Sequence, residues 1–212
     1  SRLGYEAIFG PLCAALTIYF MVRAMRESRT PLFAASGLSL ATGLYTYIAY
    51  RLFPIALVPA AIVAVVRAWR AGGAPRTRQV ALGLAIVVLT ALLTTAPLIN
   101  FARSNWPRFA GRFTEVSIFT EVEQKKSWSP LIENAVRHVE MFNYKGGIRA
   151  ASNLPERDPW QPGAAMLGAP LAILFLIGLG RCLRRAGTFV GTLMLATLVT
   201  SLIAGTLTRL EE

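Results

Sequence analysis

Long apolar runs recur along this chain, and they constrain its fold more than any other feature. Six such runs cover approximately 5–25, 32–50, 53–69, 80–99, 164–181 and 187–207. A helix that spans a bilayer needs about 20 residues, with a range of about 17–25. The first, second, fourth and sixth runs meet this length comfortably, and the third and fifth lie at its short end. The sequence therefore predicts an all-α fold, a polytopic membrane helical bundle of about six transmembrane helices.

The composition supports a membrane environment. Hydrophobic residues make up 54% of the 212 residues and charged residues only 16%, which is too apolar for an ordinary soluble domain. The net charge of +11 does not indicate nucleic-acid binding, because the basic residues lie in short loops and no long stretch interleaves them with aromatic residues. We therefore expect membrane lipid, and no nucleic acid, as a partner.

The arginines in the short loops predict an orientation. Ten arginines and a single acid, Glu27, follow the first, third and fifth runs: Arg23, Arg26, Arg29, Arg67, Arg70, Arg76, Arg78, Arg181, Arg184 and Arg185. Loops enriched in Lys and Arg remain on the cytoplasmic side of a membrane. We predict a multi-pass protein of the plasma (inner) membrane, with the region 100–163 extracytoplasmic.

This orientation divides the chain into three parts. Residues 1–99 form a four-helix membrane part, 100–163 an extracytoplasmic loop region, and 164–212 two further membrane helices. Within the loop region, 130–142 is predicted to be an amphipathic helix, because apolar residues repeat there with helical period. The weak alternation over 113–122 leaves that run open between strand and helix.

The stretch Gly37–Pro54 has its own pattern. Small residues recur four positions apart on two neighbouring helix faces, Gly37 with Ala41 on one and Ser39 with Gly43 on the other. Three tyrosines follow, at Tyr45, Tyr47 and Tyr50. Small residues let two helix backbones approach closely in lipid, and tyrosines gather at the headgroup level. Arg51 then lies at a turn before Pro54 opens the next run. The pattern predicts a packed helical hairpin with an interfacial anchor.

Arginines on the predicted outer side are candidates for binding a phosphate group. They are Arg2, Arg51, Arg103, Arg108, Arg112 and Arg149. A planar guanidinium suits bidentate contact with phosphate, although anchoring at the membrane surface is the better explanation for any single arginine. Arg2 and Arg51 are the stronger candidates because each adjoins a membrane segment.

Other catalytic and metal-binding patterns do not occur in the sequence. It contains no phosphate-binding P-loop, dinucleotide fingerprint, zinc-protease motif or nucleophile elbow, and its Cys and His residues form no cluster that predicts a zinc site. These patterns therefore identify no catalytic residue, we predict no metal ligand within this chain, and the sequence does not identify a cofactor.

Three pieces of the sequence resemble a known family. They are Ser1–Glu6 with Pro11 and Arg23; the stretch GLSLATGLYTYIAYRLFP at 37–54; and 141–162, with Met141, Phe142, Arg149, Asn153, Pro155, Pro159 and Pro162. The pattern resembles the polyprenyl-phosphate-dependent membrane glycosyltransferases of the C-type superfold, which are similar to dolichyl-phosphate-mannose–protein mannosyltransferases. Gly147 stands where that family has an acid, so the role of that acid does not carry over.

The resemblance implies a membrane glycosyltransferase that transfers a sugar from a polyprenyl-phosphate carrier to an acceptor at the outer membrane face. It implies donor-phosphate binding by Arg2 and Arg51, and substrate contacts from Tyr45, Tyr47, Arg149 and Asn153. The family's catalytic acid would lie N-terminal to Ser1, so we expect this chain to be an internal fragment of a longer enzyme.

Two alternatives from other functional classes remain open. The chain could be part of a transporter or flippase, or a non-catalytic membrane scaffold. Transporters show broken helices with polar groups near the membrane midplane, whereas polar residues here gather at one face and in one loop, which favours the enzyme. The donor sugar, the acceptor and the oligomeric state are not identified by the sequence.

Overall fold

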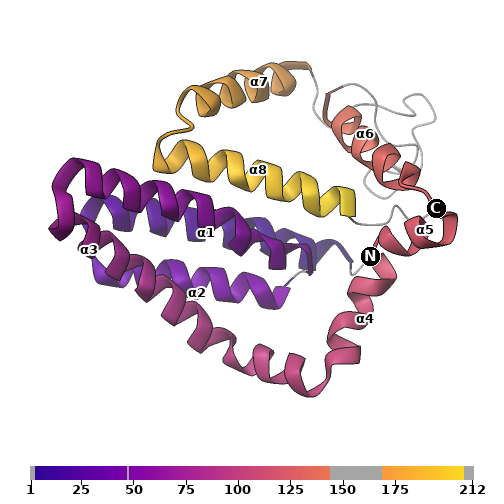
Figure 1. Ribbon diagram of the computed structural model, residues 1–212, viewed down its shortest axis with the longest axis horizontal. Coiled ribbons are helices and arrows are strands. Elements are labelled where there is room, and N and C mark those ends of the chain that lie inside the picture. The colour runs from indigo at the N-terminus through magenta and orange to yellow at the C-terminus, as the bar shows by residue number, and fades with distance from the viewer. Residues whose placement is uncertain (1–2, 47, 144–168, 208–212) are drawn as a thin grey trace. The chain divides into compact units, whose positions relative to one another are not determined.

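The computed structural model describes residues 3–46, 48–143 and 169–207, and every regular element in these ranges is a helix. The elements are α1 (Leu3–Glu27), α2 (Thr30–Thr46), the 3-10 helix η1 (Ile48–Leu52), α3 (Phe53–Ser104), α4 (Trp106–Val116), α5 (Phe119–Lys125), α6 (Ser129–Asn143), α7 (Ala169–Arg184) and α8 (Phe189–Leu207) (Figure 1). The all-α prediction is therefore confirmed.

The prediction of about six transmembrane helices is wrong. Within the described ranges, two helices are long and apolar enough to cross a membrane, Tyr50–Ser104 and Phe189–Leu207. A crossing helix has about 20 apolar residues, with a range of about 17–25, so α2 with 17 residues lies at the lower limit and α7 with 16 falls below it. The third and fourth predicted runs both belong to α3, and α1 ends in charged residues.

The chain divides into two compact units. Unit 1 combines 1–113 with 185–201, and unit 2 combines 114–184 with 202–212. Unit 1 holds α1, α2, η1, α3 and most of α8, and its core lies where α1 and α3 pack against α2. The domain boundaries expected at 99 and 163 remain a prediction.

A bend separates α3 into a first arm, 53–72, and a second arm, 74–104, which Figure 1 shows folded back along one another. Gly73 at the bend has φ 62° and ψ −152°, a conformation that is open almost only to glycine. The second arm runs parallel to α2, because its contacts with α2 advance together along both helices, from Phe33 with Gly83 to Tyr45 with Thr94.

Small residues set the spacing between these helices, as the Gly37–Ala41 pattern predicts. A Cβ added at Gly37 would lie 2.5 Å from the carbonyl oxygen of Val87 and 2.9 Å from the Cβ of Thr90. Across the other face of α2, the buried Ser36 hydroxyl donates to the carbonyl oxygen of Thr17 in α1 at 3.0 Å. Backbone contact this close gains dispersion energy and a hydrogen bond without large side chains.

Unit 2 contains the predicted amphipathic helix as α6, which confirms its helical state and its bounds within one residue. The run at 113–122, left open by its sequence, is helical in α4 and α5, with a break between Val116 and Phe119. The side-chain amide of Asn134, which is 3% exposed, donates to the carbonyl oxygen of Thr206 at 2.8 Å. This bond ties α6 to the end of α8, while the predicted apolar residue Ile132 stays 62% exposed.

Candidate functional site at the turn between α2 and α3

Two of the six predicted site residues, Arg51 and Tyr45, belong to the described part of the chain. The other four, Arg2, Tyr47, Arg149 and Asn153, lie outside the described residues. The site that can be built is therefore the turn from α2 through η1 into α3, together with the residues of unit 1 that contact it.

Arg51 lies in η1, directly before the first arm of α3, where Pro54 occupies one of the first two helical positions. Pro is well suited to the first turn because it lacks the N–H that would have no helical partner there. The short 3-10 segment reverses the chain after α2, so the sequence L-F-P both ends the turn and starts the long helix. Arg51 consequently lies just before the first residue of an apolar helix and is half-buried.

The guanidinium of Arg51 stacks on an aromatic ring from α4. Its central carbon lies 4.2 Å from the centroid of the Phe109 ring, within the range of a cation–π interaction. Trp106 extends this aromatic surface, with its ring centroid 5.9 Å from that of Phe109. The N–H groups of a guanidinium lie in its own plane, so a contact through its face leaves its edge for the bidentate geometry that a phosphate uses.

Phe109 was not predicted from the sequence as part of the site. Its partner in this contact is 58 positions earlier, and neither the helical pattern of 106–116 nor the turn chemistry around Arg51 specifies that the two meet. The only local signal is the Trp-Pro-Arg-Phe sequence at 106–109, which places an aromatic pair beside an arginine. In the folded chain, the cation over the Phe109 ring is Arg51 and not the neighbouring Arg108.

Tyr45 already has a structural partner. Its hydroxyl donates to the carbonyl oxygen of Thr94 in the second arm of α3 at 2.7 Å, while 47% of the residue remains exposed. Thr95, the next residue along the arm, donates its own hydroxyl to Ala91 one turn earlier. The phenol of Tyr45 therefore holds α2 to α3, and a substrate contact would have to use its exposed ring. That contact stays a prediction.

Tyr50 does not lie in an interfacial aromatic belt, in contrast to the expectation from its spacing. It is only 7% exposed, and its ring lies 5.1 Å from that of Phe53 in the core that includes Cys13 and Leu40. A Cβ at Gly43 would overlap the Tyr50 ring, so the second glycine of α2 makes room for it. Tyr50 thus packs this turn against the core of unit 1, while its neighbour Arg51 stays half-buried at the edge of that core.

The other predicted outer arginines in this unit differ from Arg51. Arg103 and Arg108 are exposed, at the end of α3 and in α4 respectively. Both cysteines are free thiols. Within the described ranges, no three His, Cys, Asp or Glu side chains come together as a metal-binding group.

Comparison with protein-family models, with curated proteins and with solved structures finds no match to this chain.

Proposed function

We propose that this chain is part of a membrane enzyme that transfers a sugar from a polyprenyl-phosphate carrier, and that Arg51 binds the carrier phosphate. The observation that carries the proposal is the position of Arg51, which is stacked on Phe109 at the start of a long apolar helix. A polyprenyl phosphate has a charged group attached to a hydrocarbon chain. A fixed guanidinium beside an apolar helix matches both parts of such a molecule.

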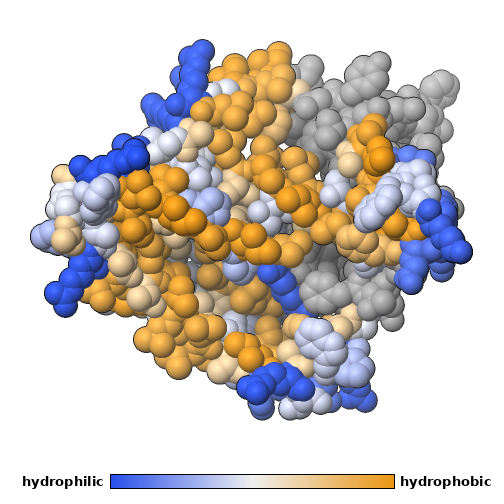
Figure 2. Space-filling model, in the orientation of Figure 1, coloured by the Kyte–Doolittle hydropathy of each residue, from blue (hydrophilic) through white to orange (hydrophobic). Residues whose placement is uncertain are grey.

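A lipid environment is supported by the exposure of the apolar helices. In the most apolar stretch of 18 residues of Tyr50–Ser104, only 22% of the stretch is buried within the protein, and in that of Phe189–Leu207 only 11%. Helices this apolar are core helices when they occur in soluble proteins, and they are then mostly buried. Figure 2 shows broad hydrophobic surface over the helices. We infer that lipid, rather than water, surrounds these faces.

The stack gives Arg51 a definite role. The contact with Phe109 restricts the guanidinium of Arg51, so less side-chain entropy is lost when a phosphate binds. A lysine at the same place would keep the charge but lose both the stacking and the paired N–H groups. The proposal assigns donor binding to Arg51 and assigns no catalytic step to the described residues.

The test is a kinetic comparison in the full-length protein, with a polyprenyl-phosphate-linked sugar as donor. Arg51→Lys and Arg51→Ala are expected to raise the KM for the donor, with alanine about tenfold or more, the cost of losing a charged hydrogen bond. Arg103→Ala is the matched control, because it removes the same charge from an exposed position in the same unit. The same substitution at Arg2 is expected to resemble Arg51→Ala.

Donor kinetics that are unchanged in both Arg51→Ala and Arg2→Ala would remove the proposal. Equal effects of Arg51→Ala and Arg103→Ala would replace it with general attraction between positive charge and the membrane surface. If the full-length protein transfers no sugar but binds the lipid donor through Arg51, the transporter or flippase alternative becomes the better description.

A further inference from the structure

A pocket at the opposite end of unit 1 from Arg51 has a chemical character of its own. It has a volume of about 490 Å³ and lies between the end of α1 and the bend of α3. Its polar lining consists of Arg26, Ser28, Arg76 and Gln79. We call it the Arg26–Arg76 pocket. Its size falls within the range of small-molecule sites, about 300–1,000 Å³.

Backbone features at two places build this pocket. Ser28 ends α1 in the left-handed region, with φ 54°, and its N–H bonds to the carbonyl oxygen of Ala24 at 2.8 Å. Gly73 gives α3 its bend with φ 62°. Both reversals occur at the same end of unit 1, so two arginines 50 positions apart line one cavity.

Arg76 is an exposed residue whose aliphatic stem packs against the bend. A Cβ added at Gly72 would lie 2.8 Å from the Cβ and 2.9 Å from the Cδ of Arg76. The aliphatic stem of Arg76 therefore lies directly against the backbone of Gly72, and an alanine there would have to displace it. A guanidinium with its stem fixed in this way loses less entropy when it binds an anion.

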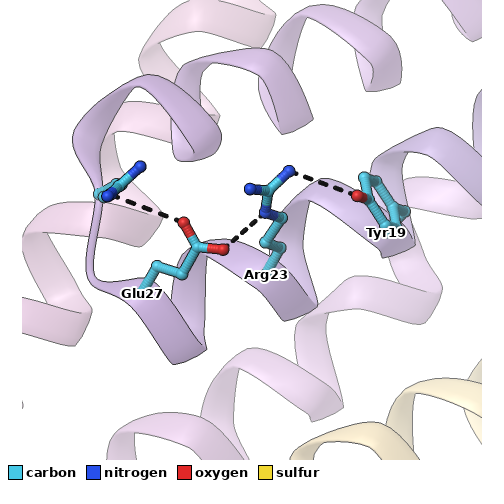
Figure 3. Close-up of polar contacts among 4 residues, drawn as sticks. Tyr19, Arg23 and Glu27 are labelled. Atoms are coloured by element: carbon cyan, nitrogen blue, oxygen red, sulfur yellow. Dashed lines mark hydrogen bonds and ion pairs between the residues drawn. The ribbon is translucent and has the colours of Figure 1, made fainter.

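The nearest acid does not neutralise this pocket. Glu27 accepts a hydrogen bond from Nε of Arg23 at 2.6 Å and lies 3.6 Å from Nε of Arg29. Figure 3 shows Glu27 and Arg23 in this contact, with the phenol of Tyr19 on the other side of Arg23. No ion pair is formed by Arg26 or Arg76 within the described residues. The pocket therefore presents two positive charges to whatever enters it.

The pocket lies at the edge of apolar surface. Met25, Pro75 and Val80 form its apolar lining. Trp69, on the first arm of α3 close to the bend, is 65% exposed, and Leu82, two residues beyond Val80, is 55% exposed. Tryptophan concentrates where hydrocarbon meets headgroups, and basic pockets between membrane helices bind anionic headgroups.

We propose that the Arg26–Arg76 pocket binds the phosphate group of an anionic membrane lipid. Arg26 and Arg76 contact the phosphate oxygens, Ser28 and Gln79 supply further polar contacts, and the acyl chains lie along the exposed apolar side chains beyond Val80. The proposal rests on the membrane placement argued above and not on sugar transfer. Free inorganic phosphate has the same charged group, so the apolar rim is what favours a lipid.

The test measures lipid binding to the purified full chain in detergent by thermal shift. The probes are dihexanoylphosphatidylglycerol, dihexanoylphosphatidylcholine and inorganic phosphate. We expect the anionic lipid to bind roughly tenfold more tightly than the zwitterionic one. The double variant Arg26→Gln/Arg76→Gln should lose this preference, because the charged hydrogen bonds from the two arginines to the phosphate together account for the roughly tenfold difference.

Arg70→Gln/Arg78→Gln is the matched control, since it removes two exposed arginines from the same bend that do not line the pocket. It should keep the preference within about threefold, because all four arginines are exposed but only Arg26 and Arg76 line the pocket. Gly72→Ala keeps every charge but displaces Arg76, so it should weaken anionic-lipid binding, and circular dichroism verifies that each variant keeps its helices.

Equal loss in the two double variants would overturn the proposal in favour of diffuse charge attraction. Inorganic phosphate that binds as tightly as the anionic lipid would overturn the lipid as occupant and identify a free-anion site. Unchanged binding in both Gly72→Ala and Arg26→Gln/Arg76→Gln would overturn the pocket itself. None of these outcomes depends on donor kinetics, so the proposed function is tested independently.

Discussion

Replacing Gly37 with alanine tests whether close backbone contact holds α2 against the second arm of α3. The added Cβ would lie 2.5 Å from the Val87 carbonyl oxygen and 2.9 Å from the Thr90 Cβ. Normal van der Waals contact needs about 3.5–4.0 Å between carbon atoms. Because the obstacles are the backbone of one residue and the Cβ of another, rotation of a side chain does not relieve the overlap, and the helices must separate.

The expected magnitude is a difference of two terms. Overpacking of a close helix contact costs about 1–3 kcal/mol. Alanine in a helix interior is more favourable than glycine by about 0.5–1 kcal/mol. The net loss of stability is therefore about 0–2.5 kcal/mol, which corresponds to a fall in Tm of up to roughly 10 °C for a chain of this length.

The assay is thermal unfolding of the purified chain in detergent, followed by tryptophan fluorescence and by circular dichroism. Gly10→Ala is the matched control, because Gly10 is also a buried helical glycine of unit 1, and its added Cβ would meet only the Tyr50 Cδ2 at an ordinary 3.8 Å. That variant is expected to keep or slightly raise the Tm. A Gly37→Ala protein as stable as the Gly10→Ala protein would refute the close-packing argument.

Three further predictions follow from single contacts. Ser36→Ala is expected to cost about 1 kcal/mol, the usual net value of a hydrogen bond, because the carbonyl oxygen of Thr17 loses its buried donor; chemical denaturation that shows no change would contradict this. The hydrogen bond from Arg23 lowers the pKa of the Glu27 carboxyl, so its contribution to stability is complete above the ordinary glutamate pKa and is lost as the pH falls through the lowered pKa. Comparison of acid-unfolding curves for the wild type and Glu27→Gln should show this pH-dependent component only in the wild type. Phe109→Leu should weaken the cation–π stack by about 0.5–2 kcal/mol and speed hydrogen exchange at the start of α4, and unchanged exchange there would show that the stack does not hold this helix.

The predicted membrane crossings show where sequence reasoning failed. Hydropathy marks apolar runs, but it does not decide where a helix begins or ends, and α2 has only 17 residues. The separation of 53–69 from 80–99 agrees with the bend at Gly73, which divides α3 into two arms between these runs. The prediction of the site was incomplete for a similar reason. Arg51 was predicted because it lies beside an apolar run, whereas Phe109, which contacts it from a distant part of the chain, was not predicted.

What the sequence determined by itself is local. The helical state of the long apolar runs, the close approach at Gly37 and the amphipathic helix beginning near Ser129 follow from residue types and spacing within one or two turns, because hydrogen bonding in a helix and its small-residue faces are set over three or four positions. The helices α4 and α5 do not, since the pattern over 113–122 fits a strand as well as a helix. Only the tertiary structure decided that Tyr50 turns inward, that Arg51 stacks on Phe109, and that Arg26 and Arg76 line one pocket. These contacts join residues far apart in the chain, and their geometry depends on where each bend directs the next helix.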